Sequence, residues 1–170
     1  TNGGIAATIP TTAGRVTTDG STVTINPAGE LASNVDFWVD IAAGAFTDQA
    51  GNPYAGISNP ATLVFTTADT TAPVLVATSP LDGATGVAVD TNVTLTFSEP
   101  VYAATGTITI HHTGSGTTVE AIPATGGQVT GSGTATITVD PAVTLGSNAD
   151  YYITIAAGAF TDQAGNPYAG

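Results

Sequence analysis

Short runs in which apolar residues alternate with threonine or serine recur along the whole chain. Within these runs β-branched or aromatic residues tend to occupy every second position, and glycine, proline, asparagine or aspartate bounds the run. A period of two is typical of strands with one buried face, so the pattern predicts an all-β protein. No segment has helical periodicity over about ten residues, apart from a single turn expected at residues 158–162. The predicted strands cover residues 61–67, 73–78, 92–98, 105–111, 117–122, 134–139 and 151–156.

These strands predict a sandwich of two antiparallel sheets. The 21 glycines and 10 prolines punctuate the strands. The chain has no cysteine, so the core must hold by packing alone. The residues expected to point inward are Leu75, Val93, Leu95, Phe97, Ile108, Ile110, Ile137, Tyr152 and Phe160.

One stretch of sequence occurs twice. Residues 41–56 and 155–170 both read IAAGAFTDQAGNPYAG, at an offset of 114. Upstream, residues 24–40 align with 138–154, and residues 9–17 align with 122–130 at an offset of 113. A period of about 114 residues suits a tandem array of whole domains better than a solenoid.

The phase of the repeat predicts where the domains lie. Residues 1–70 correspond to the C-terminal part of one repeat, and residues 71–170 to the next repeat lacking its last strand. Two explanations stay open. We favour a segment of a longer repetitive polypeptide, because boundaries set without regard to the domains would give this arrangement. In the alternative, strands from a neighbouring chain complete each unit, since an unfinished sheet exposes unpaired edge groups.

The second repeat carries a resemblance to a known family. Residues 71–101 read TAPVLVATSPLDGATGVAVDTNVTLTFSEPV, and the block ITIAAGAFTDQAGNPYAG follows at residues 153–170. Together they resemble the bacterial immunoglobulin-like repeat of large surface proteins and adhesins, of the type found in S-layer proteins. The resemblance implies an immunoglobulin-like seven-stranded antiparallel β-sandwich, placed in tandem within a long exported protein. It also implies an extracellular or cell-surface location and a role as stalk, spacer or adhesive fibre.

The net charge limits the classes of molecule that the chain can bind. The chain carries 13 acidic residues and one basic residue, Arg15, for a net charge of −12. One arginine cannot form the basic face that nucleic acid or an anionic membrane requires. No apolar run approaches the roughly 18 residues of a membrane span. The absence of lysine and cysteine also removes Schiff bases, thiolate metal sites and cysteine nucleophiles, so the remaining chemistry is that of oxygen ligands.

Sandwich topology predicts a calcium site at one pole. Asp69 lies in the linker entering strand 73–78, Glu99 in the loop after strand 92–98, and Asp162 and Asn166 in the TDQAGN loop. These segments share one end of a sandwich, and calcium prefers six to eight oxygen ligands. Asp48 and Asn52 are the repeat equivalents in the first unit. Two alternatives stay open, namely calcium elsewhere on the chain, and Asp162 and Asn166 as solvated turn formers.

The sequence predicts that the protein is not an enzyme. Its two histidines, His111 and His112, are adjacent on a predicted strand and should point to opposite faces. No G-x-S-x-G motif is present. The alternative function is a glycan- or protein-binding module of an adhesin that uses the pole loops. It is weakened by the expectation that the outward aromatic of each unit, from the pair 37–38 or 151–152, packs across strands.

Overall fold

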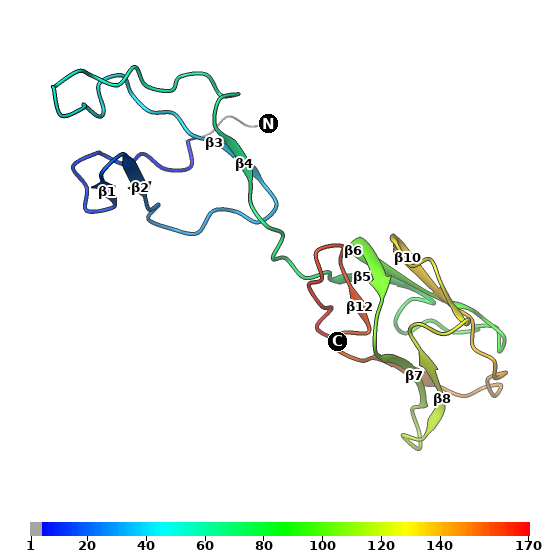
Figure 1. The fold of residues 1–170 in the computed structure, drawn as a ribbon. Helices are drawn as coiled ribbons and strands as arrows, with labels where there is room; N and C mark the ends of the chain where they lie inside the picture. Colours follow the sequence, from blue (N-terminus) through cyan, green and yellow to red (C-terminus); the bar gives the residue numbers. More distant parts are fainter. Residues whose placement is uncertain (1–4) are drawn as a thin grey trace. The chain divides into compact units, whose positions relative to one another are not determined.

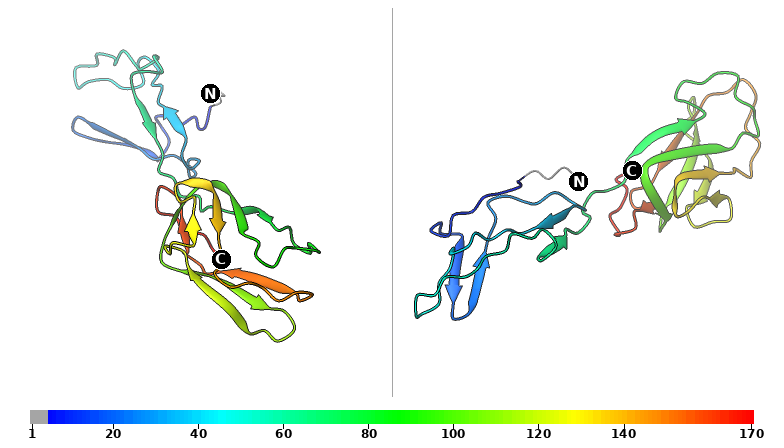
Figure 2. Two further views of the ribbon diagram at one scale, coloured as in Figure 1. Left: turned by 90° about the vertical axis from the view of Figure 1, so that its right-hand side faces the viewer. Right: turned by 90° about the horizontal axis from the view of Figure 1, so that it is seen from above.

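The fold is known from a computed structural model, which describes residues 5–170. The chain divides into two compact units, residues 1–69 (unit 1) and residues 70–170 (unit 2) (Figures 1 and 2). All regular structure in the described residues is β, as predicted. Across residues 5–170 there is no helix capable of crossing a membrane. The division falls one residue before the predicted boundary, and the first four residues of the predicted first segment lie outside the described part.

Unit 1 consists of two separate strand pairs. β1 (Val16–Asp19) and β2 (Thr22–Ile25) form an antiparallel hairpin, in which Gly20 supplies the positive φ of 58° that the tight turn requires. β3 (Asp36–Trp38) pairs antiparallel with β4 (Val64–Thr66). None of the described residues of unit 1 is fully buried. This unit therefore has strand pairing without a closed core.

Unit 2 contains two antiparallel sheets. In the first, β12 (Phe160–Thr161), β6 (Val93–Ala103), β10 (Thr134–Val139) and β9 (Val129–Thr130) lie in that order, and β5 (Leu75–Ser79) also pairs with β6. The second sheet has the order β11 (Tyr151–Ile155), β7 (Thr107–His112) and β8 (Thr118–Pro123). The views in Figures 1 and 2 show these strands within one compact body. The predicted count of seven strands per repeat stays a prediction.

The core of unit 2 is apolar and draws on both sheets. Phe97 of β6 packs against Phe160 of β12 and against Tyr168, with ring centroids 5.3 Å apart in each case. Pairs in tilted or edge geometry stabilise a core beyond their buried area. The buried hydrophobic residues are Val93, Leu95, Phe97, Val101, Ile108, Ile110, Ile122, Ala124, Ile137, Val139, Ala159 and Phe160.

Most of the predicted inward residues are buried, but the prediction for β11 was wrong. Tyr152 is 44% exposed. Its neighbour Tyr151 packs against the core instead. The register of β11 explains the difference: Tyr152 lies opposite His111 on the outer face, where the two rings stack at 4.7 Å. Leu75 is only partly buried, on the margin of the core.

Two further expectations were wrong. The segment expected to form a helical turn at residues 158–162 instead contains β12, which pairs with the end of β6. Glu99 was expected in a loop, but it lies within β6. β6 continues through this point because its first half pairs with β5 and its second half with β12. A register shift against β10 spans the same region, which accommodates Pro100 within a strand.

Candidate functional site

The loop after β12 is a turn closed by hydrogen bonds to its own side chains. The backbone N–H of Asn166 donates to Asp162 Oδ1 at 2.8 Å, and Asn166 Nδ2 donates to Asp162 Oδ2 at 2.6 Å. Gly165 adopts a positive φ of 93°, which the turn requires. Asp162 is only 3% exposed. The TDQAGN turn therefore holds the Asp162 carboxylate through two hydrogen bonds from Asn166, at a position that is buried in unit 2.

The ionised form of Asp162 is favoured in this turn. Burial acts to raise the pKa of the Asp162 carboxyl, because it penalises the charged form. Hydrogen bonds from Asn166, and from the backbone of Gly165 and Ala164, outweigh burial and hold the pKa below its ordinary value. Asp162 therefore stays an anion over the neutral range and can act as an oxygen ligand.

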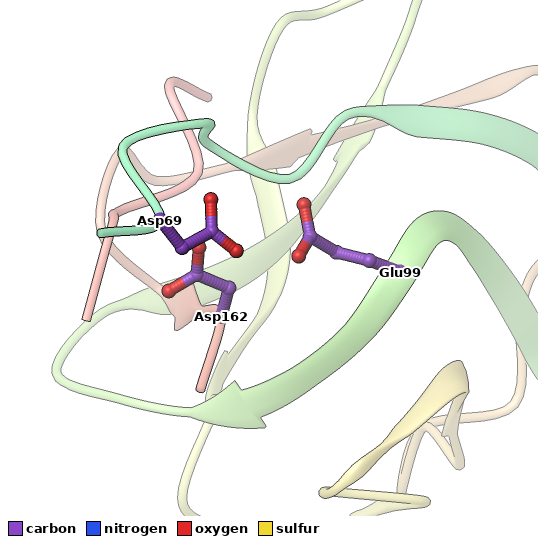
Figure 3. A group of neighbouring side chains, drawn as sticks. All are labelled: Asp69, Glu99 and Asp162. Carbon is purple, nitrogen blue, oxygen red and sulfur yellow. The ribbon is translucent and has the colours of Figure 1, made fainter. Parts of the chain in front are cut away.

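Two further carboxylates lie beside Asp162. Glu99 projects from β6, and Asp69 lies in the segment of chain that leads into β5. One carboxylate oxygen from each of the three residues lies within 4.8 Å of the others. Figure 3 shows the three side chains pointing toward one another. The structure thus brings together the three acidic residues that the topology argument placed at one pole.

This cluster, called the acidic triad below, concentrates negative charge. Asp69 and Glu99 are partly buried and Asp162 is buried. Two ionised groups about 5 Å apart repel by about 3 kcal/mol at an effective dielectric constant near 20. The chain offers no lysine and a single arginine to offset that repulsion. The donor set is all oxygen, which suits a hard divalent cation such as calcium.

Asn166 holds Asp162 in place. Its Nδ2 group donates to Asp162 and, at 3.5 Å, to the backbone carbonyl of Thr71. The amide nitrogen thus faces the neighbouring oxygens and orients the carboxylate. The predicted role of Asn166 as a direct ligand stays a prediction.

The repeat-equivalent loop in unit 1 has the same turn without the cluster. Asn52 donates from its backbone N–H and from Nδ2 to Asp48, each at 2.8 Å. These bonds lower the pKa of Asp48, with the Asn52 side chain as the largest cause. Asp48 is exposed. Among the described residues it belongs to no comparable group of three acidic or metal-ligating side chains.

The two histidines point to opposite faces of β7. His111 stacks on Tyr152 and its Nε2 lies 3.1 Å from Thr154 Oγ1. His112 packs edge-on against Tyr151. Both rings make cross-strand contacts with β11, which explains them as packing residues.

Glu120, which organises a loop of unit 2, was not predicted from the sequence. The carboxylate of Glu120 accepts hydrogen bonds from Gln128 Nε2 at 2.8 Å and from the backbone N–H groups of Ala142 and Val143 at 3.1 and 3.3 Å. It ties β8 to the loop after β10. The only available signal is a single acid within an otherwise uncharged strand, and its partners lie too far along the chain to be foreseen.

Comparison with known proteins agrees with the fold. The chain matches the family described as bacterial Ig-like domain twice, over residues 2–67 and 69–170. The second match begins at Asp69 and so contains the whole acidic triad. Searches of curated proteins and of solved structures gave no match. The family matches account for nearly the whole sequence, and the chain belongs to the bacterial Ig-like domain family.

Proposed function

We propose that this chain is a spacer segment of a bacterial surface adhesin or extracellular filament, and that calcium bound by the acidic triad stiffens it. The proposal rests above all on the convergence of Asp69, Glu99 and Asp162 within 4.8 Å. Two tandem matches to an Ig-like family support the spacer role. The partners would be neighbouring Ig-like repeats, and the location the bacterial cell surface.

Calcium fits the triad better than a transition metal. Three carboxylates can supply three to six oxygens, and backbone carbonyls or water would complete the six to eight that calcium takes. No cysteine is present to favour zinc through thiolate ligands. Binding would neutralise the mutual repulsion of the carboxylates, which is the source of the expected stabilisation.

The position of Asp69 explains how binding would affect stiffness. Asp69 lies in the segment that leads into β5, whereas Glu99 lies in β6 and Asp162 in the loop after β12. Asp69 also accepts a hydrogen bond from Ser33 Oγ at 3.0 Å. A cation held by all three carboxylates would restrain the backbone at residues 69–71, where the chain passes from one unit to the next. Calcium would then reduce the flexibility of the linker.

Thermal unfolding with and without calcium tests this proposal. Extracellular calcium modules bind with a Kd of about 0.1–1 mM. Roughly 5 mM calcium should therefore stabilise unit 2 by about 1–2 kcal/mol relative to excess chelator. For a domain of this size the melting temperature should rise by at least about 4 °C. The Asp162→Asn variant should lose this rise, whereas the Asp48→Asn variant should keep it.

Small-angle scattering tests the mechanical part. The two-unit chain should sample a narrower range of end-to-end distances with calcium than with chelator. Equal melting temperatures in the two conditions would refute the calcium site. An unchanged distance distribution despite calcium binding would refute only the stiffening role.

A further inference from the structure

The segment that enters β6 contains the acceptor sequence for a sugar on asparagine. Residues 92–94 read Asn-Val-Thr, and none of the other seven asparagines of the chain has serine or threonine two positions later. Asn-x-Ser/Thr, with any residue except proline in the middle, is the acceptor tripeptide of N-glycosylation. Asp90 stands two positions before Asn92. Bacterial oligosaccharyltransferases select an acidic residue at that position, so the match extends over five residues.

Asn92 has no structural role of the kind that explains most other asparagines. Its side chain is exposed, and its amide group makes no hydrogen bond within residues 5–170. Only its backbone carbonyl is bonded, by Thr91 Oγ1 at 3.2 Å. By contrast, five asparagines shape turns, two through a positive φ and three through side-chain hydrogen bonds: Asn34, Asn148, Asn52, Asn59 and Asn166. The amide nitrogen of Asn92 is thus accessible to a reagent.

The surroundings of Asn92 leave room for a bulky group. Val93 and Leu95 point into the core, where they are 6% and 1% exposed. Because side chains alternate along a strand, Thr94 lies on the outer face of β6, and Asn92 precedes it by two positions. Asp90 and residues 81–88 of the preceding loop are exposed as well. A sugar on Asn92 would extend into solvent and displace no core side chain.

The acceptor tripeptide and the acidic triad lie at different ends of β6. Asn92 comes directly before this strand, and Glu99 follows seven residues later. At about 3.3 Å per residue, the two positions are roughly 20 Å apart along the strand. A sugar on Asn92 and a cation at the triad would therefore not compete.

Strand pairing limits when the sugar can be attached. Thr94 lies opposite Ser79 of β5 and opposite Thr138 of β10, so its backbone has a neighbour on both sides. An enzyme that draws the tripeptide into its own cleft needs that backbone unpaired. β10 follows the tripeptide by about forty residues, so a chain that is still being exported presents the tripeptide before β10 can pair with it.

We propose that Asn92 is an N-glycosylation site, modified during export by an oligosaccharyltransferase that uses a polyprenyl-diphosphate-linked oligosaccharide. The amide nitrogen of Asn92 attacks C1 of the first sugar and forms the C–N bond. The bond from C1 to the diphosphate oxygen breaks, the amide nitrogen gives up one proton, and the polyprenyl diphosphate leaves. The modification goes beyond the spacer role, and it rests on the proposed extracellular location because the transfer occurs on exported chains.

The test expresses the full chain, with an added export signal, in a bacterium that carries a bacterial oligosaccharyltransferase and a lipid-linked oligosaccharide of known mass. The intact mass should rise by one oligosaccharide, located on the peptide that contains Asn92. The variants Asn92→Gln, Thr94→Val and Asp90→Asn should lose it, because each removes one element of the acceptor sequence. Thr94→Ser keeps the hydroxyl group and should keep the sugar. Asn26→Gln, a change outside the acceptor sequence, is the matched control and should also keep it.

A second copy of residues 90–94, appended after Gly170 through a flexible linker, shows that the transferase is active. Sugar on the appended copy alone would overturn the proposal, and so would a sugar that persists in Asn92→Gln. Because the added signal supplies export, failure of the transfer counts against the site and leaves the proposed location untouched.

The timing has its own test with purified transferase and lipid-linked oligosaccharide. A synthetic peptide of residues 88–96 should accept the sugar, whereas the folded chain should remain unmodified. Equal rates for the peptide and the folded chain would overturn modification before β10 pairs. A peptide that accepts no sugar would overturn Asn92 as an acceptor.

Discussion

Residues 41–56 and 155–170 have the same sequence but different environments. Both form the same turn, with asparagine donating twice to the aspartate four residues before it. Yet Phe160 is fully buried and Asp162 nearly so, while Phe46 is half-buried and Asp48 is exposed. The comparison teaches that sixteen local residues determine the turn, and that burial and charge clustering come from strands elsewhere in the chain.

β6 and its pairing with β12 account for the different burial of the two copies. β12 pairs with the end of β6, and Phe160 packs against Phe97. β6 also supplies Glu99. The described part of unit 1 has no counterpart of this strand beside Phe46. Within residues 5–170, the same sequence is thus a core segment with an acidic triad in unit 2 and an exposed turn in unit 1.

The largest expected effect comes from removing the aromatic ring of this repeat. Phe160→Ala should destabilise unit 2 by about 3–5 kcal/mol, because a buried phenylalanine leaves a cavity. Phe46→Ala, the same change at the equivalent position, should cost less than about half as much. Urea unfolding followed by the NMR amide signals of each unit measures both. Equal losses in the two variants would break the comparison.

A smaller loss of stability is expected at Gly106, where the backbone of unit 2 comes close to Ala159 of the repeated segment. A Cβ atom on Gly106 would lie 2.7 Å from Ala159 Cα and 2.8 Å from its Cβ. Gly106→Ala should therefore destabilise unit 2 by about 1–3 kcal/mol through overpacking. Gly127→Ala is the matched control, since nothing lies within 4 Å of its added methyl group. Urea midpoints that are unchanged by Gly106→Ala would show that residues 104–106 are not packed as described.

The smallest effect concerns the pKa of the two aspartates. Both carboxyl pKa values lie below the ordinary value of 3.8, and the paired asparagine contributes in each case. A carboxyl group whose pKa is lower in the folded protein than in the unfolded protein stabilises the fold at pH values above the unfolded pKa. That stabilisation is lost as the pH falls through the folded pKa. Asn52→Ala and Asn166→Ala should each raise the pKa of their partner. Carboxyl carbon chemical shifts from pH 2 to about 6 measure this, and an unshifted Asp48 in Asn52→Ala would contradict it.

Much of the fold follows from the sequence. Alternating β-branched residues locate β5, β7, β8, β10 and β11 within a few residues, and the repeat locates the TDQAGN turn. The pattern failed at Tyr152, because two adjacent tyrosines give no sign of which one faces inward. It also failed at Glu99, because proline after an acid looks like a loop. β6 continues through Glu99 because it pairs first with β5 and then with β12, and the local sequence does not reveal these partners.

The candidate site was partly foreseeable. Topology rules placed Asp69, Glu99 and Asp162 at one pole, although Glu99 comes from a strand. The position of Asn166 followed from the loop sequence, but its donation to Asp162 required the turn geometry. Glu120 could not be found, since its partners at residues 128, 142 and 143 come from separate segments.

Calcium titration by isothermal calorimetry tests the central claim most directly. The chain contains two copies of the TDQAGN loop, of which one belongs to an acidic triad. The account predicts one calcium ion per chain, with binding lost in Asp162→Asn and Glu99→Gln and retained in Asp48→Asn. Absence of binding, two equivalent sites per chain, or loss of binding in Asp48→Asn would contradict it.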